Sequence, residues 1–316
     1  MRPTRRHLLS ISDLSDDEMR YLVSRGAQYA TRFAAGTAGG EQPLAGHVVG
    51  IYFRKTSTRT RTAFSTGALR LGAQIVTFGP NDLQENTGES SEDTARVLSS
   101  MLDVLVARTT GAQEELEGWA QQDRMSVVNA MTGPEHPTQA LADLTSLMLH
   151  FGRIEDLRLL YIGEGNNTAT ALARSLTRYP GVELWMVTPP GYGLDAATSA
   201  TAVQQAEQSG CRFVETHDPA APPATVDVVY ATRWQTTGSS KPDPDWRTIF
   251  APYQVDEKMM ARYPDAVFMH DLPAHRGEDV TAEVIDGPTS IAFRQAENKL
   301  YSAMAVMEWC ALGRHE

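Results

Sequence analysis

The chain has 316 residues and a mass of 34.6 kDa, a size that predicts one or two domains. Hydrophobic residues make up 41% and charged residues 21% of the chain, which excludes a disordered or collagen-like protein. A formal net charge of −11 argues against a general nucleic-acid-binding protein. The two cysteines, Cys211 and Cys310, are too few for a disulfide framework or a structural zinc cluster.

The sequence carries no signal for a membrane or for export. It contains no run of about 18 apolar residues, the length that a membrane-spanning helix needs. The first residues are basic and lack the apolar core of a signal peptide. We therefore expect a soluble cytoplasmic protein that binds neither a membrane nor nucleic acid.

Short runs of apolar and β-branched residues alternate with longer segments whose apolar residues recur every three or four positions. The short runs predict β-strands at 48–53, 74–78, 104–107, 126–129, 158–162, 183–187, 212–215, 226–230 and 267–270. The longer segments predict helices at 94–102, 138–150, 168–179 and 295–310. Strand, helix and strand in repetition predict an α/β fold with doubly wound parallel sheets, which carry helices on both faces.

So many strands favour two sheets over one. The segment 149–156 combines a helix end, Gly152 and several charged residues, and we interpret it as the crossing into a second α/β domain. The predicted domains are 1–150 and 151–290. The segment 291–316 is expected to be a C-terminal helix that packs back on the first domain.

The strongest local motif is the stretch from Ser57 to Thr60, which follows the strand predicted at 48–53. Ser57 is expected to cap a helix whose first turn holds Thr58, Arg59 and Thr60. Free backbone N–H groups, hydroxyl groups and a guanidinium suit a tetrahedral dianion such as phosphate. The alternative is a solvated basic helix start that binds no ligand.

A second motif, from His136 to Gln139, precedes the helix predicted at 138–150. Pro137 suits an early helix position, which places His136 at the helix N-terminus. The positive end of the helix dipole disfavours an imidazolium, so a neutral imidazole that polarises a carbonyl group is expected. The alternative is a histidine that only caps its own helix.

Two further strand ends carry polar residues. His270 and Asp271 follow the last predicted strand, at the kind of edge where ligands gather in open α/β sheets. Gly163 and Gly165 lie in another strand-to-helix turn, but the third glycine of a dinucleotide fingerprint is absent, which argues against a nucleotide-dependent dehydrogenase.

The histidines and cysteines lack zinc-site spacing, so no metal is expected. The polar loop 235–246 is typical of a mobile functional loop.

Taken in order, these segments resemble the aspartate/ornithine carbamoyltransferase family. The stretch Ser57 to Arg61 is similar to the family's carbamoyl-phosphate motif, and the stretch His136 to Gln139 is similar to its carbonyl-binding motif. The segment from Leu272 to Met307 resembles ornithine carbamoyltransferases in particular. Segments 92–98 and 163–167 do so as well.

The resemblance implies two α/β domains with the active site between them: a carbamoyl-phosphate-binding domain at 1–150 and an amino-acid-binding domain at 151–290. It implies a homotrimer that moves a carbamoyl group from carbamoyl phosphate to an amine, without a cofactor. Its implied donor residues, which hold the phosphate or stabilise the charge that develops on the carbonyl oxygen, are Ser57, Thr58, Arg59, Thr60, Arg108, His136, Gln139 and Arg276. Its implied acceptor-side residues are Asn167 and Leu272, with Gln84 in the loop that a neighbouring subunit donates.

The acceptor motif departs from the ornithine branch. Thr232 stands where ornithine enzymes carry an aspartate that reads the acceptor's α-amino group, and Thr236 stands in place of the serine of their Ser-Met pair. Thr232, Arg233 and Gln235 instead resemble the Thr-Arg-x-Gln of aspartate carbamoyltransferases. The Lys-Glu-Arg continuation of those enzymes is absent here, as is the lysine that they donate between subunits.

Two more departures concern charge. Asp271 replaces a cysteine of the ornithine enzymes, and Lys299 replaces an arginine. An acid beside the acceptor can orient an ammonium group or take a proton from the reacting amine. We therefore expect an N-carbamoyltransferase closest to the ornithine branch, acting on ornithine or a shorter diamino acid. An aspartate-type enzyme and a catalytically silent regulatory relative that binds carbamoyl phosphate or an amino acid are the alternatives.

Overall fold

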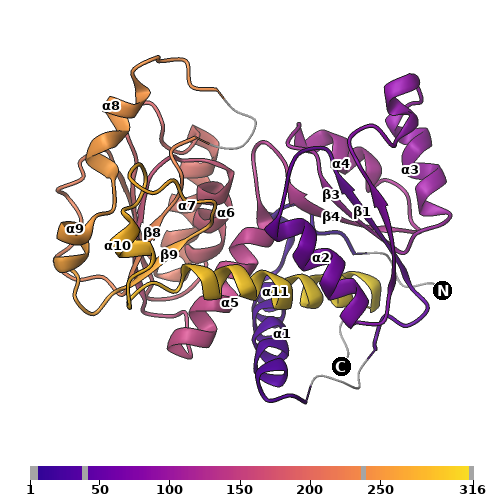
Figure 1. Ribbon diagram of the computed structural model, residues 1–316, viewed down its shortest axis with the longest axis horizontal. Helices are drawn as coiled ribbons and strands as arrows, with labels where there is room; N and C mark the ends of the chain where they lie inside the picture. Colours follow the sequence, from indigo (N-terminus) through magenta and orange to yellow (C-terminus); the bar gives the residue numbers. More distant parts are fainter. Residues whose placement is uncertain (1–5, 38–41, 236–239, 313–316) are drawn as a thin grey trace. The chain divides into compact units, whose positions relative to one another are not determined.

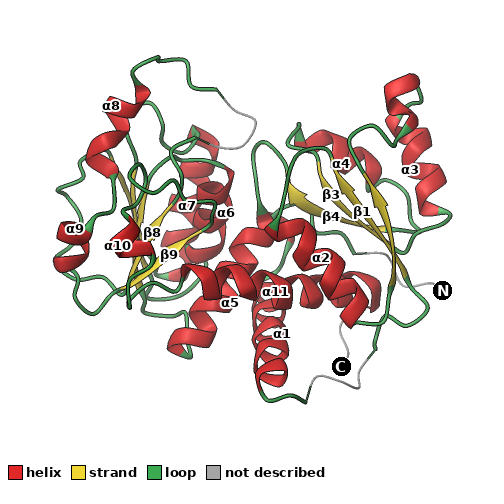
Figure 2. Cartoon of the chain, viewed as in Figure 1, coloured by secondary structure: helices red, strands yellow, loops and turns green. Residues whose placement is uncertain are grey.

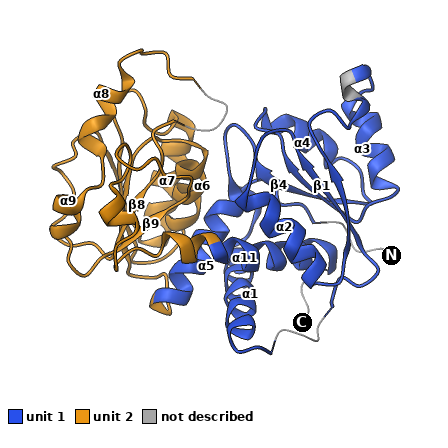
Figure 3. Ribbon diagram, viewed as in Figure 1, with its two compact units in different colours: residues 1–150, 297–316 blue, residues 151–296 orange. Residues whose placement is uncertain are grey.

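The computed structural model describes residues 6–37, 42–235 and 240–312. The chain forms two compact units, which Figure 3 distinguishes by colour: unit 1 holds residues 1–150 and 297–316, and unit 2 holds residues 151–296. Each unit contains one parallel β-sheet with helices packed on it (Figures 1 and 2). The predicted α/β fold class is therefore confirmed.

Unit 1 is built on a sheet with the strand order β2-β1-β3-β4, all parallel. The strands are β1 (Val48–Phe53), β2 (Gln74–Phe78), β3 (Val104–Arg108) and β4 (Ser126–Met131). The helices are α1 (Asp16–Ala34), α2 (Arg59–Arg70), α3 (Ser91–Ser99), α4 (Gln113–Trp119) and α5 (Pro137–Phe151), with short 3-10 turns η1 (Ile11–Asp13) and η2 (Gln84–Thr87). The C-terminal helix α11 (Ala292–Leu312) contributes its residues from Glu297 onward.

The central strands of unit 1 are buried on both faces, as their continuous apolar sequences predict. Tyr52 and Leu105 belong to one cluster together with Leu116 and Trp119 of α4. The neighbouring strand residue Val106 faces the opposite side and is fully buried as well. Figure 2 shows helices covering both faces of this sheet.

The C-terminal helix packs on unit 1, as expected. Asn298 donates to the Ser146 hydroxyl of α5 at 3.0 Å, and the Ser126 hydroxyl of β4 donates to the Cys310 carbonyl at 2.9 Å. Buried polar groups of α11 thus find partners on segments more than a hundred residues away. These bonds satisfy groups that burial would otherwise leave unpaired.

Unit 2 is built on a second parallel sheet, with the strand order β7-β6-β5-β8-β9. Its strands are β5 (Arg158–Ile162), β6 (Glu183–Val187), β7 (Arg212–Thr216), β8 (Val228–Ala231) and β9 (Val267–His270). Its helices are α6 (Asn167–Leu176), α7 (Ala196–Ser209), α8 (Trp246–Phe250), α9 (Glu257–Ala261) and α10 (Ala282–Ile285), with the 3-10 turn η3 (Ala251–Tyr253). One face of the sheet packs Leu160, Val229 and Phe268 into a core that also contains Val284 and Ile285.

The predicted strands agree with the observed ones to within two residues at each end. The largest shifts are of two residues: β4 ends at Met131, and β8 begins at Val228, where its register against β5 and β9 starts. The helix predicted at 94–102 begins earlier, at Ser91, because the Ser90 side chain caps it by accepting from the Asp93 N–H at 3.1 Å. Helix α6 ends at Leu176, three residues before the predicted end.

Candidate functional site

In each sheet, the strands whose carboxyl ends carry the predicted site residues are neighbours. Strands β1, β3 and β4 lie side by side in unit 1, and strands β5, β8 and β9 lie side by side in unit 2. In unit 1 the chain runs from β1 to β2 on one side of β1 and then crosses to β3 on the other side. In unit 2 it runs from β5 to β6 and β7 on one side of β5 and then crosses to β8 on the other side. A topological switch point therefore lies beside β1 and beside β5. Ligands of open α/β sheets bind at such points, beyond the carboxyl ends of the strands.

Helix α2 begins after β1 with a short loop, and its cap differs from the prediction. The N-cap is Thr58 rather than Ser57, and no side chain caps the helix. Thr58 is in the right-handed helical region, so its hydroxyl is not placed to accept from the first turn, as an extended cap residue would be. Ser57 and Arg59 are half-buried, Thr58 is exposed and Thr60 is buried. The first-turn N–H groups at this helix end are suited to an anion.

His136 lies immediately before α5, as predicted. Its carbonyl accepts from the Gln139 N–H at 3.0 Å, so it is the residue that opens the helix. The side chain is 5% exposed, and burial lowers the pKa of His136 well below 6.5, with Lys299, Arg108 and Arg59 adding to the effect. The imidazole is therefore neutral at pH 7. The Thr138 hydroxyl is 3.3 Å from Nδ1. In the tautomer whose Nδ1 accepts from this hydroxyl, Nε2–H remains to donate to a carbonyl oxygen.

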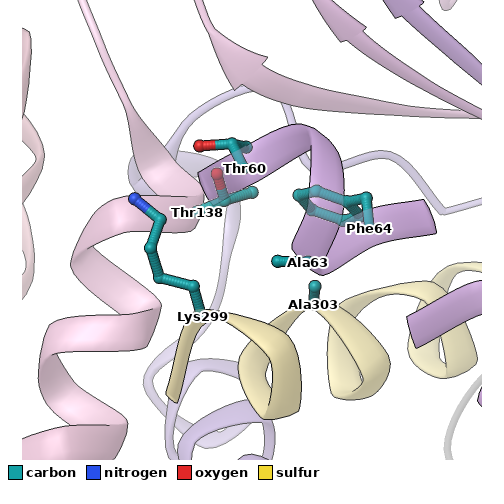
Figure 4. Close-up of a pocket in the computed structure, with 6 residues that line it drawn as sticks. All are labelled: Thr60, Ala63, Phe64, Thr138, Lys299 and Ala303. Atoms are coloured by element: carbon teal, nitrogen blue, oxygen red, sulfur yellow. The ribbon is translucent and has the colours of Figure 1, made fainter. Parts of the chain in front are cut away.

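Gln139 is held between a cation and an anion. The Lys299 ammonium donates to its side-chain carbonyl, and its amide N–H donates to Asp143 Oδ1 at 2.8 Å. All three side chains are buried. Figure 4 shows the Lys299 ammonium beside Thr138 and Thr60, on the polar side of a gap that is too narrow to admit a water molecule. Gln139 and Lys299 are thus brought to the start of α5, close to the His136 ring.

Arg108 is the last residue of β3 and is 8% exposed. Its carbonyl accepts from the Arg54 N–H at 3.0 Å, which ties the end of β3 to the loop that precedes α2. Arg54 itself pairs with Glu115 and donates to the Tyr52 hydroxyl at 3.0 Å. The guanidinium of Arg54 is therefore committed to Glu115, whereas Arg108 and Arg59 act on the pKa of His136.

In unit 2, the Asp271 carboxylate accepts hydrogen bonds from the hydroxyl groups of two threonines. The Thr168 hydroxyl donates to Oδ2 at 3.0 Å, and the Thr232 hydroxyl lies 3.1 Å from both carboxylate oxygens. Asn166, the N-cap of α6, donates to the Thr232 hydroxyl at 3.2 Å. The Asp271 side chain is 12% exposed, and among the residues that the structure describes no lysine or arginine pairs with it.

The glycines before α6 bring these groups together. Gly163 has a φ of +135°, and a Cβ atom there would lie 2.8 Å from Thr232 Cγ2. A Cβ atom at Gly165 would lie 2.2 Å from the backbone carbon of Gly193. Both positions require glycine because backbone segments approach so closely. The Gly-x-Gly pattern therefore serves the packing of this turn against Thr232 and residues 193–194.

The strand-end histidine His270 has a structural environment. It is fully buried, its Nε2 donates to Asp279 at 2.8 Å, and its Nδ1 accepts from the Leu272 N–H at 2.8 Å. Asp279 also accepts from the His275 N–H at 3.1 Å. The imidazole thus holds the backbone at Leu272 and, through Asp279, at His275, and both of its nitrogens are engaged.

The remaining predicted residues have varied positions. Asn167 is the first residue of α6 and is 6% exposed, while Leu272, Arg233 and Gln235 are half-buried. Arg276 is exposed and forms a two-bond ion pair with Asp286, at 2.7 and 3.2 Å. Gln84 is exposed in η2, where its side chain accepts from the Thr87 hydroxyl at 2.7 Å. Thr236 lies outside the described residues.

Sequence reasoning missed three residues that shape these sites: Asp143, Asn166 and Thr168. Asp143 lies four residues after Gln139, a spacing that puts both on one face of a helix and could have indicated their contact. Asn166 and Thr168 flank the predicted Asn167, and an asparagine before an apolar helix is a cap signal. The contact of Asn166 with Thr232 and the contact of Thr168 with Asp271 depend on β5, β8 and β9 lying side by side, which was not visible in the sequence. Within the described part of the chain, no three His, Cys, Asp or Glu side chains gather as a metal site.

Comparison with known proteins relates both units to one family. Residues 6–148 match the family model of the aspartate/ornithine carbamoyltransferase carbamoyl-P binding domain. Residues 155–310 match that of the aspartate/ornithine carbamoyltransferase Asp/Orn binding domain. No helix in the described ranges is long and apolar enough to cross a membrane.

Individual relatives match over nearly their whole length. An ornithine carbamoyltransferase of Caldicellulosiruptor saccharolyticus is 38% identical over 311 residues, which cover 98% of this chain and 99% of the relative. One from Methanothermobacter thermautotrophicus is 37% identical over 305 residues, covering 96% and 98%. The solved structure of ornithine carbamoyltransferase from Pyrococcus furiosus superposes with a TM-score of 0.91 at 34% identity, covering 99% of both chains.

Proposed function

The chain belongs to the aspartate/ornithine carbamoyltransferase family, and on that premise we propose that it transfers the carbamoyl group of carbamoyl phosphate to an amine of an amino acid, releasing phosphate. The observation that carries the donor half is the buried, neutral His136 at the start of α5, with Arg59, Arg108 and Lys299 close enough to lower its pKa. A neutral donor among cations suits a ligand with both a carbonyl oxygen and a phosphate.

We assign the phosphate to the start of α2. There Ser57, Thr58 and Thr60 offer hydroxyl groups, the first-turn N–H groups can donate to an anion, and Arg59 supplies a positive charge. The carbonyl oxygen takes the Nε2–H of His136, with Arg108 nearby. Gln139, fixed by Asp143 and Lys299, completes this end of the site.

The reaction needs no nucleophile from the protein. The acceptor's neutral amine attacks the carbonyl carbon, so that a C–N bond forms and the carbonyl oxygen becomes an oxyanion. The bond between that carbon and the bridging phosphate oxygen then breaks, phosphate leaves, and the amine nitrogen loses a proton. The protein stabilises the oxyanion electrostatically, and holding both reactants in place accounts for about 7–11 kcal/mol of the barrier.

Asp271 supports an acceptor with a second cationic group. A largely buried carboxylate is costly unless it is paired, and the two threonine hydroxyls supply hydrogen bonds without compensating its charge. An ammonium group of the acceptor supplies that compensation. We therefore propose ornithine or a shorter diamino acid, such as 2,3-diaminopropionate, as the acceptor. The further residues that we propose for the acceptor are Asn167, Leu272, Arg233, Gln235 and Thr236, and Arg276 is proposed for the carbamoyl group and phosphate.

We propose a homotrimer as the working assembly, with Gln84 offered to the neighbouring subunit. The support is on unit 1, where β2 is an edge strand with three exposed residues. Val97 of α3 and Met101, which follows the end of α3, are 48% and 68% exposed. Edge strands and exposed apolar residues of this kind favour association. The cytoplasmic location stays a prediction.

The test is carbamoyl-phosphate-dependent phosphate release with a panel of acceptors: ornithine, lysine, 2,4-diaminobutyrate, 2,3-diaminopropionate, putrescine and aspartate. We expect a diamino acid to react fastest. Arg59→Ala should lower kcat by roughly 10²–10³-fold, the scale of loss when one group that stabilises transition-state charge is removed. Aspartate as the best acceptor would favour the aspartate-type alternative. If none of these acceptors supports phosphate release while carbamoyl phosphate still binds, the proposal is overturned in favour of a regulatory relative.

Asp271→Asn tests the acceptor half separately. The amide keeps the shape of the side chain but removes its charge, so we expect the KM for the diamino acid to rise about 10–100-fold, as for loss of a charge-assisted hydrogen bond. The KM for carbamoyl phosphate should stay unchanged. Asp265→Asn, at an exposed position of unit 2, is the matched control. An unchanged KM in Asp271→Asn would show that the acceptor's cation is bound elsewhere.

A further inference from the structure

Lys241 lies in the polar loop 235–246 and yet its side chain is 2% exposed. Its ammonium is 2.5 Å from Glu164 Oε1 and lies over the rings of Tyr192 and Phe250, at 4.4 and 4.5 Å from their centroids. The Trp246 ring is 5.6 Å away. Burial lowers the pKa of Lys241, and Glu164 acts in the opposite direction. The group is thus a lysine held in an aromatic box with one carboxylate.

One side of this box is the turn that leads to the acceptor residues. Glu164 lies between Gly163 and Gly165, two residues before Asn166 and three before Asn167. Its backbone carbonyl accepts from the Asn166 N–H at 2.8 Å and from the Tyr161 hydroxyl at 2.6 Å. Tyr192 is joined to the same turn, because its carbonyl accepts from the Gly165 N–H at 2.7 Å.

The other side of the box leads to the end of β8. Phe250 is fully buried and contacts Trp234, with their ring centroids 5.8 Å apart. Trp234 is flanked by Arg233 and Gln235, two residues after Thr232. Lys241 therefore stands between the two segments that hold the Asp271 carboxylate in place, the β5–α6 turn and the residues that follow β8.

We propose that Lys241 is a positioning residue for the acceptor site, which locks the β5–α6 turn and the 232–235 segment into one arrangement through Glu164 and the aromatic box. This role rests on the proposed function and concerns the acceptor half alone. An ammonium that is bonded to Glu164 and packed on two rings ties three segments together at once. A surface lysine, which exchanges its partners with water, has no such effect.

The first test needs no substrate. Hydrogen exchange of the backbone amides is compared in the wild-type protein, in Lys241→Met and in the control Lys258→Met, which changes an exposed lysine of α9. Methionine can stay in the aromatic box but cannot pair with Glu164. We expect faster exchange at both 163–168 and 240–250 in Lys241→Met, and no change in the control. Faster exchange at 240–250 alone would overturn the proposal.

The second test is kinetic and uses the acceptor that the panel identifies. Lys241→Met should raise the KM for the acceptor about tenfold, because small misplacements of binding groups are costly, and should leave the KM for carbamoyl phosphate unchanged. Lys241→Arg should restore most of the affinity, since arginine keeps the charge and packs on aromatic rings. Equal losses for both substrates, or no rescue by arginine, would show a general structural role. If the wild-type protein uses no acceptor, the proposed function fails, while the exchange result still decides whether the lock exists.

Discussion

At the scale of single residues, the environment of His136 sets its chemistry. A helix N-terminus disfavours a protonated imidazole, and in the folded chain burial is the larger cause, followed by Lys299, Arg108 and Arg59. The outcome is a ring that donates a hydrogen bond without carrying a charge. Such a donor polarises a carbonyl group over a wide pH range, because its protonation state does not change near neutral pH.

This shift predicts a pH-dependent stability. Below about pH 6.5 the unfolded chain binds a proton at His136 that the folded chain does not bind, so the free energy of unfolding falls as the pH falls. The contribution of this one group is at most about 1.4 kcal/mol per pH unit. Urea unfolding at pH 7, 6 and 5 measures it.

His136→Gln is the comparison that isolates this residue. The variant lacks the titrating group but keeps His7 and the other histidines, so its free energy of unfolding should fall less steeply between pH 6.5 and pH 5 than that of the wild-type protein. Identical slopes for the two proteins would contradict a depressed pKa of His136 in the folded state.

At the scale of elements, α1 and α11 are joined by a buried ion pair. Arg25 donates two hydrogen bonds to Glu308, at 2.8 and 2.9 Å, and the Tyr29 hydroxyl donates to the same carboxylate at 2.7 Å. Glu308 is 2% exposed. Burial and the Glu308 hydrogen bond raise the pKa of Tyr29, which therefore stays protonated as a donor.

Glu308→Ala should lower the free energy of unfolding by about 2–3 kcal/mol, because it leaves Arg25 and Tyr29 without their acceptor. This value lies below the range for a fully buried pair, since Arg25 keeps some contact with water. Urea unfolding at pH 7 is the measurement. Glu207→Ala, at an exposed position of α7, should change the free energy by less than about 0.5 kcal/mol. Equal effects of the two substitutions would show that the ion pair does not stabilise α11.

At the scale of the whole molecule, the proposed trimer makes a direct prediction. Light scattering after size-exclusion chromatography should give three times the chain mass of 34.6 kDa. Val76 on the edge strand β2 is 41% exposed, and Val203 on α7 of unit 2 is 46% exposed. Val76→Glu should dissociate the assembly, because it places a charge on the apolar edge, while Val203→Glu should not. A monomeric wild-type protein, or a trimer that survives Val76→Glu, would contradict this interface.

Several features were determined by the sequence alone. Strand positions, the fold class and the helix that begins at Pro137 follow from local patterns, because burial on both faces of a sheet requires continuous apolar runs and proline fixes a helix start. The family motifs at 57–61 and 136–139 are also local, and they are sufficient to indicate the family. Even the direction of the His136 pKa shift could be derived from its position before a helix.

Only the tertiary structure decided how distant residues are paired. Three sets of contacts join segments that are far apart in the sequence. They are the hydrogen bonds of Asp271 with Thr168 and Thr232, the contact of Lys299 with Gln139, and the contacts around Lys241. Strand order sets the partners of Asp271, whereas the packing of α11 on α5 sets the contact of Lys299 with Gln139. The N-cap of α2 is Thr58 and not the predicted Ser57, because the backbone conformation of the cap depends on how the loop leaves β1. Local propensity fixes which elements form, but the order in which parallel strands lie side by side determines which side chains meet.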